Sequence, residues 1–362
     1  MNSMKKIFLI VVVFPLLLQC NKTDDPIPSI VEPTPPESVV NKVNVPDDKG
    51  FDLLSEYNFF EGNLADLNPN TEAGVLPYDL NTVLFSDYAS KERFIYVPDG
   101  QQIPFDTTGA LELPIGSILI KHFYYPEEEA VDDYIETRLF IKKADGWQPE
   151  IYEWNDEQTD AERTVIGGTR QLTVTANGEQ RTFNYLIPNQ NQCKNCHAYN
   201  ANIQPIGPTI HNLNRSYEYA DGTANQLDRW QALGILSNPT ITDIPQWAGI
   251  DDTSVSIHER ARAYLAVNCS SCHRIEGSAA NSGLYLEYNN KDSLSLGFWK
   301  TPVAAGDGSG GLSFAIYPGK ADESILLFRM ISDEVDGRMP EIGRELLHEE
   351  GISLIREWID SM

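Results

Sequence analysis

The pentapeptide pattern Cys-x-x-Cys-His occurs twice, as CKNCH at residues 193–197 and as CSSCH at residues 269–273. Together the two copies use four of the chain's five cysteines. Two thiols three residues apart can each bond to one edge of a flat ring, and the histidine that follows then lies beneath that ring. The pattern therefore defines two points at which the fold must leave room for such a ring.

This spacing is the attachment signature of c-type haem. Each cysteine forms a thioether with one vinyl group of the porphyrin, and the histidine ligates the iron. The sequence therefore predicts two covalently bound haem c groups. The attachment residues are Cys193, Cys196, Cys269 and Cys272, and the iron ligands are His197 and His273.

Two other uses of these cysteines stay open. The four could bind one structural zinc ion, although zinc ribbons usually have a shorter separation than that between Cys196 and Cys269. Each Cys-x-x-Cys pair could also form a disulfide in an exported protein. Both alternatives leave His197 and His273 without a role, so the sequence favours haem.

The fifth cysteine follows an N-terminal leader. Lys5 and Lys6 precede an apolar run at residues 7–18, which is typical of a secretory signal peptide and too short for a permanent membrane span. The run ends in LLLQC at residues 16–20, which resembles the lipobox of bacterial lipoproteins, although Gln19 replaces the usual small residue. The resemblance implies a signal peptide over residues 1–19, a lipid on Cys20, and an outer-membrane lipoprotein on the periplasmic side or the cell surface. The alternative is ordinary cleavage nearby and a free thiol.

Cysteine usage and charge agree with an exported protein. One lipid and four thioethers would use all five cysteines, and haem c is attached outside the cytoplasmic membrane. The formal net charge is −26, which makes nucleic acid an improbable partner. The acidic surface either keeps the exported protein soluble or attracts a basic redox protein, and the first reading is the commoner one.

The mature chain divides into a tether and a β domain before the first motif. Residues 20–50 are rich in proline and acidic residues and predict a disordered tether. Residues 51–190 predict an antiparallel β domain, with strands expected at residues 93–97, 117–125, 134–142, 171–175 and 181–187. Asn177-Gly178 predicts a tight hairpin turn between the last two.

Two haem modules are expected after the β domain. Residues 191–250 would form the first, with a helix at 225–236, and residues 251–362 the second. In the second, Ser256 and Glu259 predict a capping box that opens a helix into Cys269, and further helices are expected at 322–331 and 349–359. With the Met-Pro loop at 337–343, this pattern resembles a class I cytochrome c domain. The expected fold is therefore multidomain: an all-β N-terminal domain followed by all-α cytochrome c-like haem modules.

The same resemblance implies Met339 as the sixth ligand of the second iron. Thioether ligation favours ferrous iron and raises the reduction potential. Met330 is the rival, but it lies in an apolar helical pattern that favours core packing. For the first iron the candidate is His211, with His122 and His258 as alternatives, and an open sixth position is also possible.

Beyond the motifs, the chain from residue 54 to the C-terminus resembles an uncharacterised family of bacterial dihaem c-type cytochromes. The stretches that carry the resemblance are residues 78–82, 84–88, 136–139, 154–161, 213–215 and 317–319, together with the two haem motifs. The family implies two haems and an architecture, without a known reaction.

Three functions fit these observations. The first is a lipid-anchored electron carrier that is not an enzyme, transferring electrons between redox proteins whose identity the sequence leaves open. The second is a haem enzyme of the dihaem peroxidase type, in which one iron keeps an open position. The third is a surface binding protein whose aromatic-rich β domain recognises a partner while the haems serve a neighbouring oxidoreductase.

Overall fold

A six-stranded antiparallel sheet carries the first motif on one of its faces. The computed structural model describes residues 42–126, 133–200, 202–239, 243–303 and 305–362, and residues 41–362 form one unit. The predicted signal peptide, Cys20 and most of the predicted tether lie outside the described residues. Within the described part of the chain, no helix has the length and apolar character needed to cross a bilayer.

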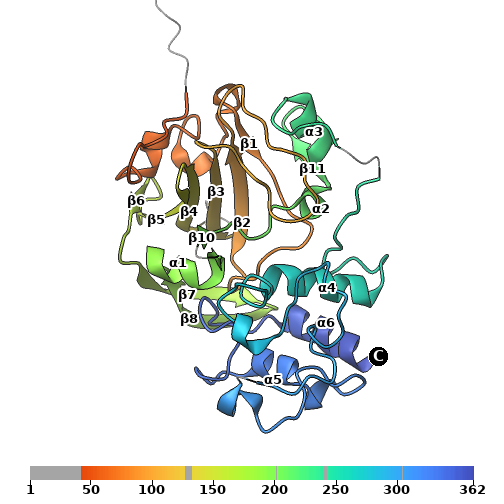
Figure 1. Cartoon of the computed structure of the whole chain (residues 1–362). Helices are drawn as coiled ribbons and strands as arrows, with labels where there is room; N and C mark the ends of the chain where they lie inside the picture. The colour runs from red at the N-terminus through yellow and green to blue at the C-terminus, as the bar shows by residue number, and fades with distance from the viewer. Residues whose placement is uncertain (1–41, 127–132, 201, 240–242, 304) are drawn as a thin grey trace, which may run out of the picture. The chain divides into compact units, whose positions relative to one another are not determined.

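The sheet is a meander in which each strand pairs with the next one along the chain (Figure 1). Its strands are β1 (Val75–Pro77), β2 (Ser90–Tyr96), β3 (Ile118–Tyr125), β4 (Asp133–Lys143), β5 (Gly146–Trp154) and β6 (Ala161–Arg163). The register is regular except for a bulge between Phe123 and Tyr124. This arrangement agrees with the antiparallel β domain predicted for residues 51–190.

The N-terminal segment covers one face of the sheet. Side chains such as Ile120 and Leu139 pack on this face against Leu54 and Tyr57. The segment contains the 3-10 helices η1 (Leu54–Tyr57), η2 (Leu64–Asp66) and η3 (Thr71–Ala73). Packing begins upstream of them, at Val43, which is buried in the same cluster although the tether was predicted to run to residue 50.

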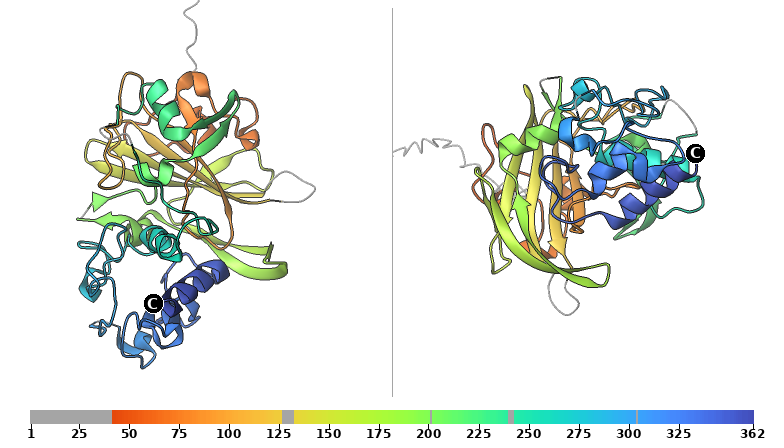
Figure 2. Two further views of the ribbon diagram at one scale, coloured as in Figure 1. Left: turned by 90° about the vertical axis from the view of Figure 1, so that its right-hand side faces the viewer. Right: turned by 90° about the horizontal axis from the view of Figure 1, so that it is seen from below.

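A long hairpin covers part of the opposite face. Strands β7 (Gly168–Ala176) and β8 (Glu179–Ile187) pair over their full length. Asn177 and Gly178 form the two-residue turn with φ of 52° and 78°, as predicted for this dipeptide. The hairpin lies between the six-stranded sheet and the C-terminal segment (Figure 2), and Arg181 forms an ion pair with Glu349 of that segment.

The segment that carries the first motif mixes short helices and short hairpins. Its elements are α1 (Gln190–His197), β9 (Ala198–Tyr199), β10 (Asn202–Ile203), α2 (Ile210–Leu213), β11 (Ser216–Tyr219), β12 (Gly222–Asn225) and α3 (Gln226–Ala232). Helix α3 falls within the helix predicted at residues 225–236, and Gly234 beyond it has a φ of 76°. Ala220 and Asp221 form the turn between β11 and β12.

The C-terminal segment contains α4 (Ile257–Asn268), α5 (Ile325–Ile331) and α6 (Glu349–Asp360). Both hydrogen bonds of the capping box predicted from Ser256 and Glu259 are present at α4. Leu265 of α4 packs against Leu354 and Trp358 of α6 in one buried cluster. Between these helices lie turns and the 3-10 helices η4 (Ala280–Ser282), η5 (Gly306–Ser309) and η6 (Ala321–Glu323).

The prediction of all-α cytochrome c-like modules is therefore wrong. Two β hairpins interrupt residues 191–250, and residues 274–320 contain no α-helix among the described positions. The apolar and capping patterns identified individual helices correctly. They did not account for the many glycine, asparagine and serine residues between the helices, which favour turns. The chain is mostly an antiparallel β structure with a few helices.

Gly167 provides a test of how the sheet positions the first motif. Its φ is 67°, and a Cβ would lie 2.4 Å from the Ile187 carbonyl oxygen and 2.8 Å from the Asn189 nitrogen, just before α1. We expect Gly167→Ala to lower the free energy of unfolding by about 1–3 kcal/mol, because alanine is strained at this left-handed φ and its Cβ would clash with these two backbone atoms. Gly168→Ala is the matched control, because nothing lies within 4 Å of its Cβ position. Urea unfolding of both full-length variants measures the difference, and equal stabilities would contradict this account.

Candidate functional site

The first Cys-x-x-Cys-His motif forms the second half of α1. Asn189 caps this helix, accepting a hydrogen bond from the Gln192 amide while the Gln192 side chain accepts one from the Asn189 amide. Cys193 is buried in the apolar cluster that includes Phe123 and Tyr185. The helix therefore rests on the sheet through its first motif cysteine, and His197 is its last residue.

The hydrogen bonding of His197 suits an iron ligand. Its Nδ1 lies 2.7 Å from the carbonyl oxygen of Gln204, which can only accept, so Nδ1 carries the hydrogen and Nε2 keeps its lone pair. Burial lowers the pKa of His197 to about 4, so the ring is neutral at pH 7. A metal-binding histidine typically donates its second nitrogen to a carbonyl in this way. The Phe140 ring lies 4.6 Å away, centroid to centroid.

The second motif also holds its histidine through a hydrogen bond at Nδ1, although this motif follows the end of a helix and the first lies within one. Cys269 ends α4, and the amides of Cys272 and His273 both donate to its carbonyl oxygen. His273 Nδ1 lies 3.3 Å from the Ser282 hydroxyl oxygen. That hydroxyl donates to the Ala279 carbonyl oxygen at 2.7 Å, so it accepts from His273 and leaves Nε2 with the lone pair. Burial lowers the pKa of His273 to about 4.

The donor set at each motif fits a thioether-linked haem. All four motif cysteines are unpaired thiols, so each can form a thioether. Each motif also presents a neutral imidazole nitrogen. No group of three or more His, Cys, Asp or Glu side chains among the described residues is arranged to hold a metal ion, and none of the four cysteines forms a disulfide.

The two motifs contact each other. The thiols of Cys196 and Cys272 lie close enough to interact, and this interaction is the largest influence on both groups: it raises the pKa of Cys196 and lowers that of Cys272 to about 6. Cys272 Sγ also lies 3.5 Å from the Asn195 carbonyl oxygen. The attachment points of the two predicted haems are therefore neighbours.

Arg274 adds a second connection between the motifs. Its guanidinium donates to the Gln204 side-chain oxygen and to the Ala198 carbonyl oxygen, each at 3.4 Å, and lies 4.3 Å from the centre of the Tyr199 ring. Arg274 directly follows His273, and Ala198 directly follows His197. The residue thus ties the two ligand regions together.

The loop that contains Met339 lies near the second motif. The Met339 amide donates to the Arg329 carbonyl oxygen at 2.8 Å, and Arg344 donates to the Met339 carbonyl oxygen at 3.0 Å. After burial, the next influence that lowers the pKa of His273 is the charge of Arg329, which places Arg329 near the second motif. Met330 instead lies buried in the core between α4 and α6.

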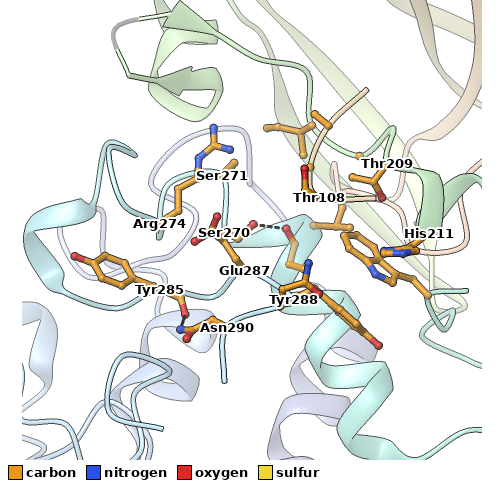
Figure 3. A pocket seen from close by; sticks show the side chains of 18 of the residues that line it. Thr108, Thr209, His211, Ser270, Ser271, Arg274, Tyr285, Glu287, Tyr288 and Asn290 are labelled. Carbon is orange, nitrogen blue, oxygen red and sulfur yellow. Dashed lines mark hydrogen bonds between the residues drawn. The ribbon is translucent and has the colours of Figure 1, made fainter. Parts of the chain in front are cut away.

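His211 lines a cavity of about 380 Å³ beside the second motif (Figure 3). Ser270 and Ser271, which separate Cys269 from Cys272, line the same cavity, with Arg274 on the side opposite His211. The structure thus brings His211 to the second motif, whereas the sequence analysis considered it for the first iron.

His122 and His258 lie away from the motifs. His122 is fully buried on the sheet face opposite Cys193, where Nδ1 lies 2.7 Å from the Thr137 hydroxyl. His258 lies in the first turn of α4 and accepts a hydrogen bond from the Trp358 indole, eleven residues or about 16 Å along the helix from Cys269. His348, which the sequence analysis did not consider, stacks on Phe85 at 4.3 Å.

Sequence reasoning also missed the groups that orient the two ligands. Gln204 acts through its backbone carbonyl, so no side-chain pattern could reveal it. Ser282 lies nine residues beyond His273 in a turn with no recognised spacing. Arg274 could have been noticed only as the residue that follows the second motif.

Comparison of the chain with protein-family models, with curated proteins and with solved structures found no match.

The hydrogen bond between His273 and the Ser282 hydroxyl is expected to influence the reduction potential of the second iron. In a variant with Cys193→Ala and Cys196→Ala, which keeps only the second attachment site, we expect Ser282→Ala to raise the reduction potential. Without the Ser282 hydroxyl as an acceptor, the His273 imidazole donates less electron density to the iron. A spectroscopic redox titration measures the change, and Ser282→Thr, which keeps the hydroxyl, should restore the original potential. Identical potentials in all three proteins would contradict this role.

Proposed function

We propose that this chain is a dihaem c-type cytochrome that transfers single electrons outside the cytoplasmic membrane. The observation that carries the proposal is the contact between the two Cys-x-x-Cys-His motifs. The thiols of Cys196 and Cys272, 76 residues apart in sequence, interact, and Cys272 Sγ lies 3.5 Å from the Asn195 carbonyl oxygen. Each bound haem would supply a one-electron ferric/ferrous couple, and attachment at neighbouring sulfurs makes the two groups neighbours.

The protein's own residues support a relay with two fixed centres. The first ligand is held by α1 on the sheet and by the Gln204 carbonyl, and the second by the end of α4 and the Ser282 hydroxyl. Arg274 then sets the spacing between the two segments. Fixed ligands and fixed spacing suit electron transfer, because little reorganisation accompanies a change of charge.

The remaining parts of the proposal follow from the sequence. A lipid on Cys20 would anchor the protein to the outer membrane, and Met339 would be the sixth ligand of the second iron. The position of the Met339 loop beside Arg329 supports this assignment. The partners would be one redox protein that donates electrons to the haems and another that accepts electrons from them.

A haem enzyme of the peroxidase type is the second candidate. The cavity of about 380 Å³ that reaches Ser270 and Ser271 favours it, because a small oxidant could approach the second motif there. Turnover of hydrogen peroxide with a reduced electron donor would distinguish this candidate from a simple carrier. The surface-binding alternative lacks comparable support, since Phe123, Trp147, Tyr152 and Trp154 of the β domain are all buried.

The relay predicts interacting redox centres. We expect the haem-loaded protein to titrate in two steps, with oxidation of one haem raising the potential of the other, because two charges this close interact electrostatically. Electron paramagnetic resonance during a redox titration measures both centres.

Two one-haem proteins serve as controls for this titration: Cys193→Ala with Cys196→Ala, and Cys269→Ala with Cys272→Ala. Each should keep one haem and titrate in a single step, and the control that keeps the higher-potential haem should titrate below the upper step of the unaltered protein, because it lacks the charge of an oxidised partner. Two independent titrations in the unaltered protein, matching the two controls, would overturn the relay. A protein without haem after expression in a host that matures c-type cytochromes would overturn the function itself.

A further inference from the structure

Two of the four motif cysteines pack against apolar cores, and the other two lie beside each other. Cys193 is buried in the cluster that includes Phe123, and Cys269 packs against the core between α4 and α6. Cys196 and Cys272 are half-buried, and their thiols lie close enough to interact. Both are free thiols in this structure. One sulfur of each motif is therefore placed beside a sulfur of the other motif.

Contacts on both sides of this pair hold the two segments together. Cys272 Sγ lies 3.5 Å from the carbonyl oxygen of Asn195, the residue before Cys196. Arg274, two residues after Cys272, donates to the carbonyl oxygen of Ala198, two residues after Cys196, at 3.4 Å. The proximity of the two thiols therefore depends on backbone positions as well as on side-chain rotamers. A bond between the two sulfurs requires no refolding of either segment.

The folded chain disfavours a bond within either motif. Cys193 and Cys196 both lie inside α1, three residues apart. Cβ atoms at this helical spacing are about 5–6 Å apart, whereas a disulfide needs about 3.5–4.5 Å. In the second motif, a bond to Cys272 would compete with the packing of Cys269 against the core. The pair between the motifs is the one that the fold leaves free to react.

An oxidant that carries a disulfide can reach this pair, because Lys194 and Asn195 beside Cys196 and Ile275 beyond Cys272 are exposed. One cysteine, as its thiolate, would attack a sulfur of the oxidant, forming a mixed disulfide and releasing one thiolate. The other cysteine would then attack the mixed disulfide and release the second thiolate. Two cysteine thiols are thus oxidised to one disulfide, the oxidant is reduced to two thiols, and the two cysteine protons pass to those thiols.

We propose that Cys196 and Cys272 form a disulfide in the haem-free chain, and that this bond must be reduced before both haems attach. The proposal rests on the proposed function, which places the chain in the oxidising compartment outside the cytoplasmic membrane. A sulfur within a disulfide has no thiol to add to a vinyl group, so one bond blocks a thioether at each motif. A thiol reductant that acts before attachment would therefore control both sites together.

Peptide mapping of the haem-free full chain tests the proposal. Cys20→Ser leaves the four motif cysteines as the only thiols, and the protein is equilibrated with oxidised and reduced glutathione. Trypsin cleavage after Lys194 separates Cys193 from Cys196. We expect the peptide that contains Cys196 to be crosslinked to the peptide that contains Cys272, with the loss of two hydrogen atoms. Crosslinks confined within a motif, or glutathione adducts without a crosslink, would overturn the proposal.

Two matched variants in the same background identify the sulfurs. Cys193→Ala with Cys269→Ala keeps only the proposed pair, and it should form the crosslink to the same extent as the four-cysteine chain. Cys196→Ala with Cys272→Ala keeps the two cysteines that pack against the cores, and it should form no crosslink in the same glutathione mixture. Equal crosslinking in the two variants would overturn the proposal.

Unfolding by urea shows whether the native fold accommodates the bond. A disulfide that fits the fold stabilises it, because the bond closes a long loop in the unfolded chain. The variant that keeps only Cys196 and Cys272 should therefore unfold at a higher urea concentration when oxidised than after reduction. An equal or lower midpoint would count against the proposal. Unmodified motifs in a host that matures c-type cytochromes would instead refute the proposed function and leave the crosslinking result unaffected.

Discussion

The contact between Cys196 and Cys272 is the constraint on which the site depends. The two residues reach it from separate parts of the chain: Cys196 lies on a helix that rests on the sheet, and Cys272 follows a helix that packs on α6. Closing so long a loop costs conformational entropy, which one contact between two thiols cannot offset. The surrounding packing must therefore hold both segments in place, and Arg274 joins them directly.

The stretches that carried the family resemblance provide much of that packing. Asp87 accepts hydrogen bonds from the amides of Glu345 and Leu346, and the Asn268 side chain accepts one from the Phe85 amide. These bonds connect the sheet to the C-terminal segment on both sides of the second motif. Thr82 exchanges two hydrogen bonds with Asn212, which fixes the segment after the first motif. The stretches that carry the resemblance thus include residues whose hydrogen bonds hold the two motif segments in place. The resemblance itself stays a prediction.

Local signals in the sequence predicted local structure well. Asn177-Gly178 predicted the hairpin turn because both positions need positive φ, and Ser256 with Glu259 predicted the start of α4. Strand β5 was missed because it contains Pro149, which argues against a paired strand. The all-α modules were inferred from a few correct helices, without weighing the turn-forming residues between them. The motif residues proposed to bind haem could be named from spacing, whereas Gln204 and Ser282, which orient the two histidines, are set by tertiary packing that no local pattern encodes.

The most direct measurement is mass spectrometry of the full-length protein, produced in a host that matures c-type cytochromes and then digested into peptides. The account predicts one haem mass on the peptide that contains Cys193 and Cys196 and a second on the peptide that contains Cys269 and Cys272. Unmodified cysteines at both motifs, or a haem on only one of the two peptides, would contradict it.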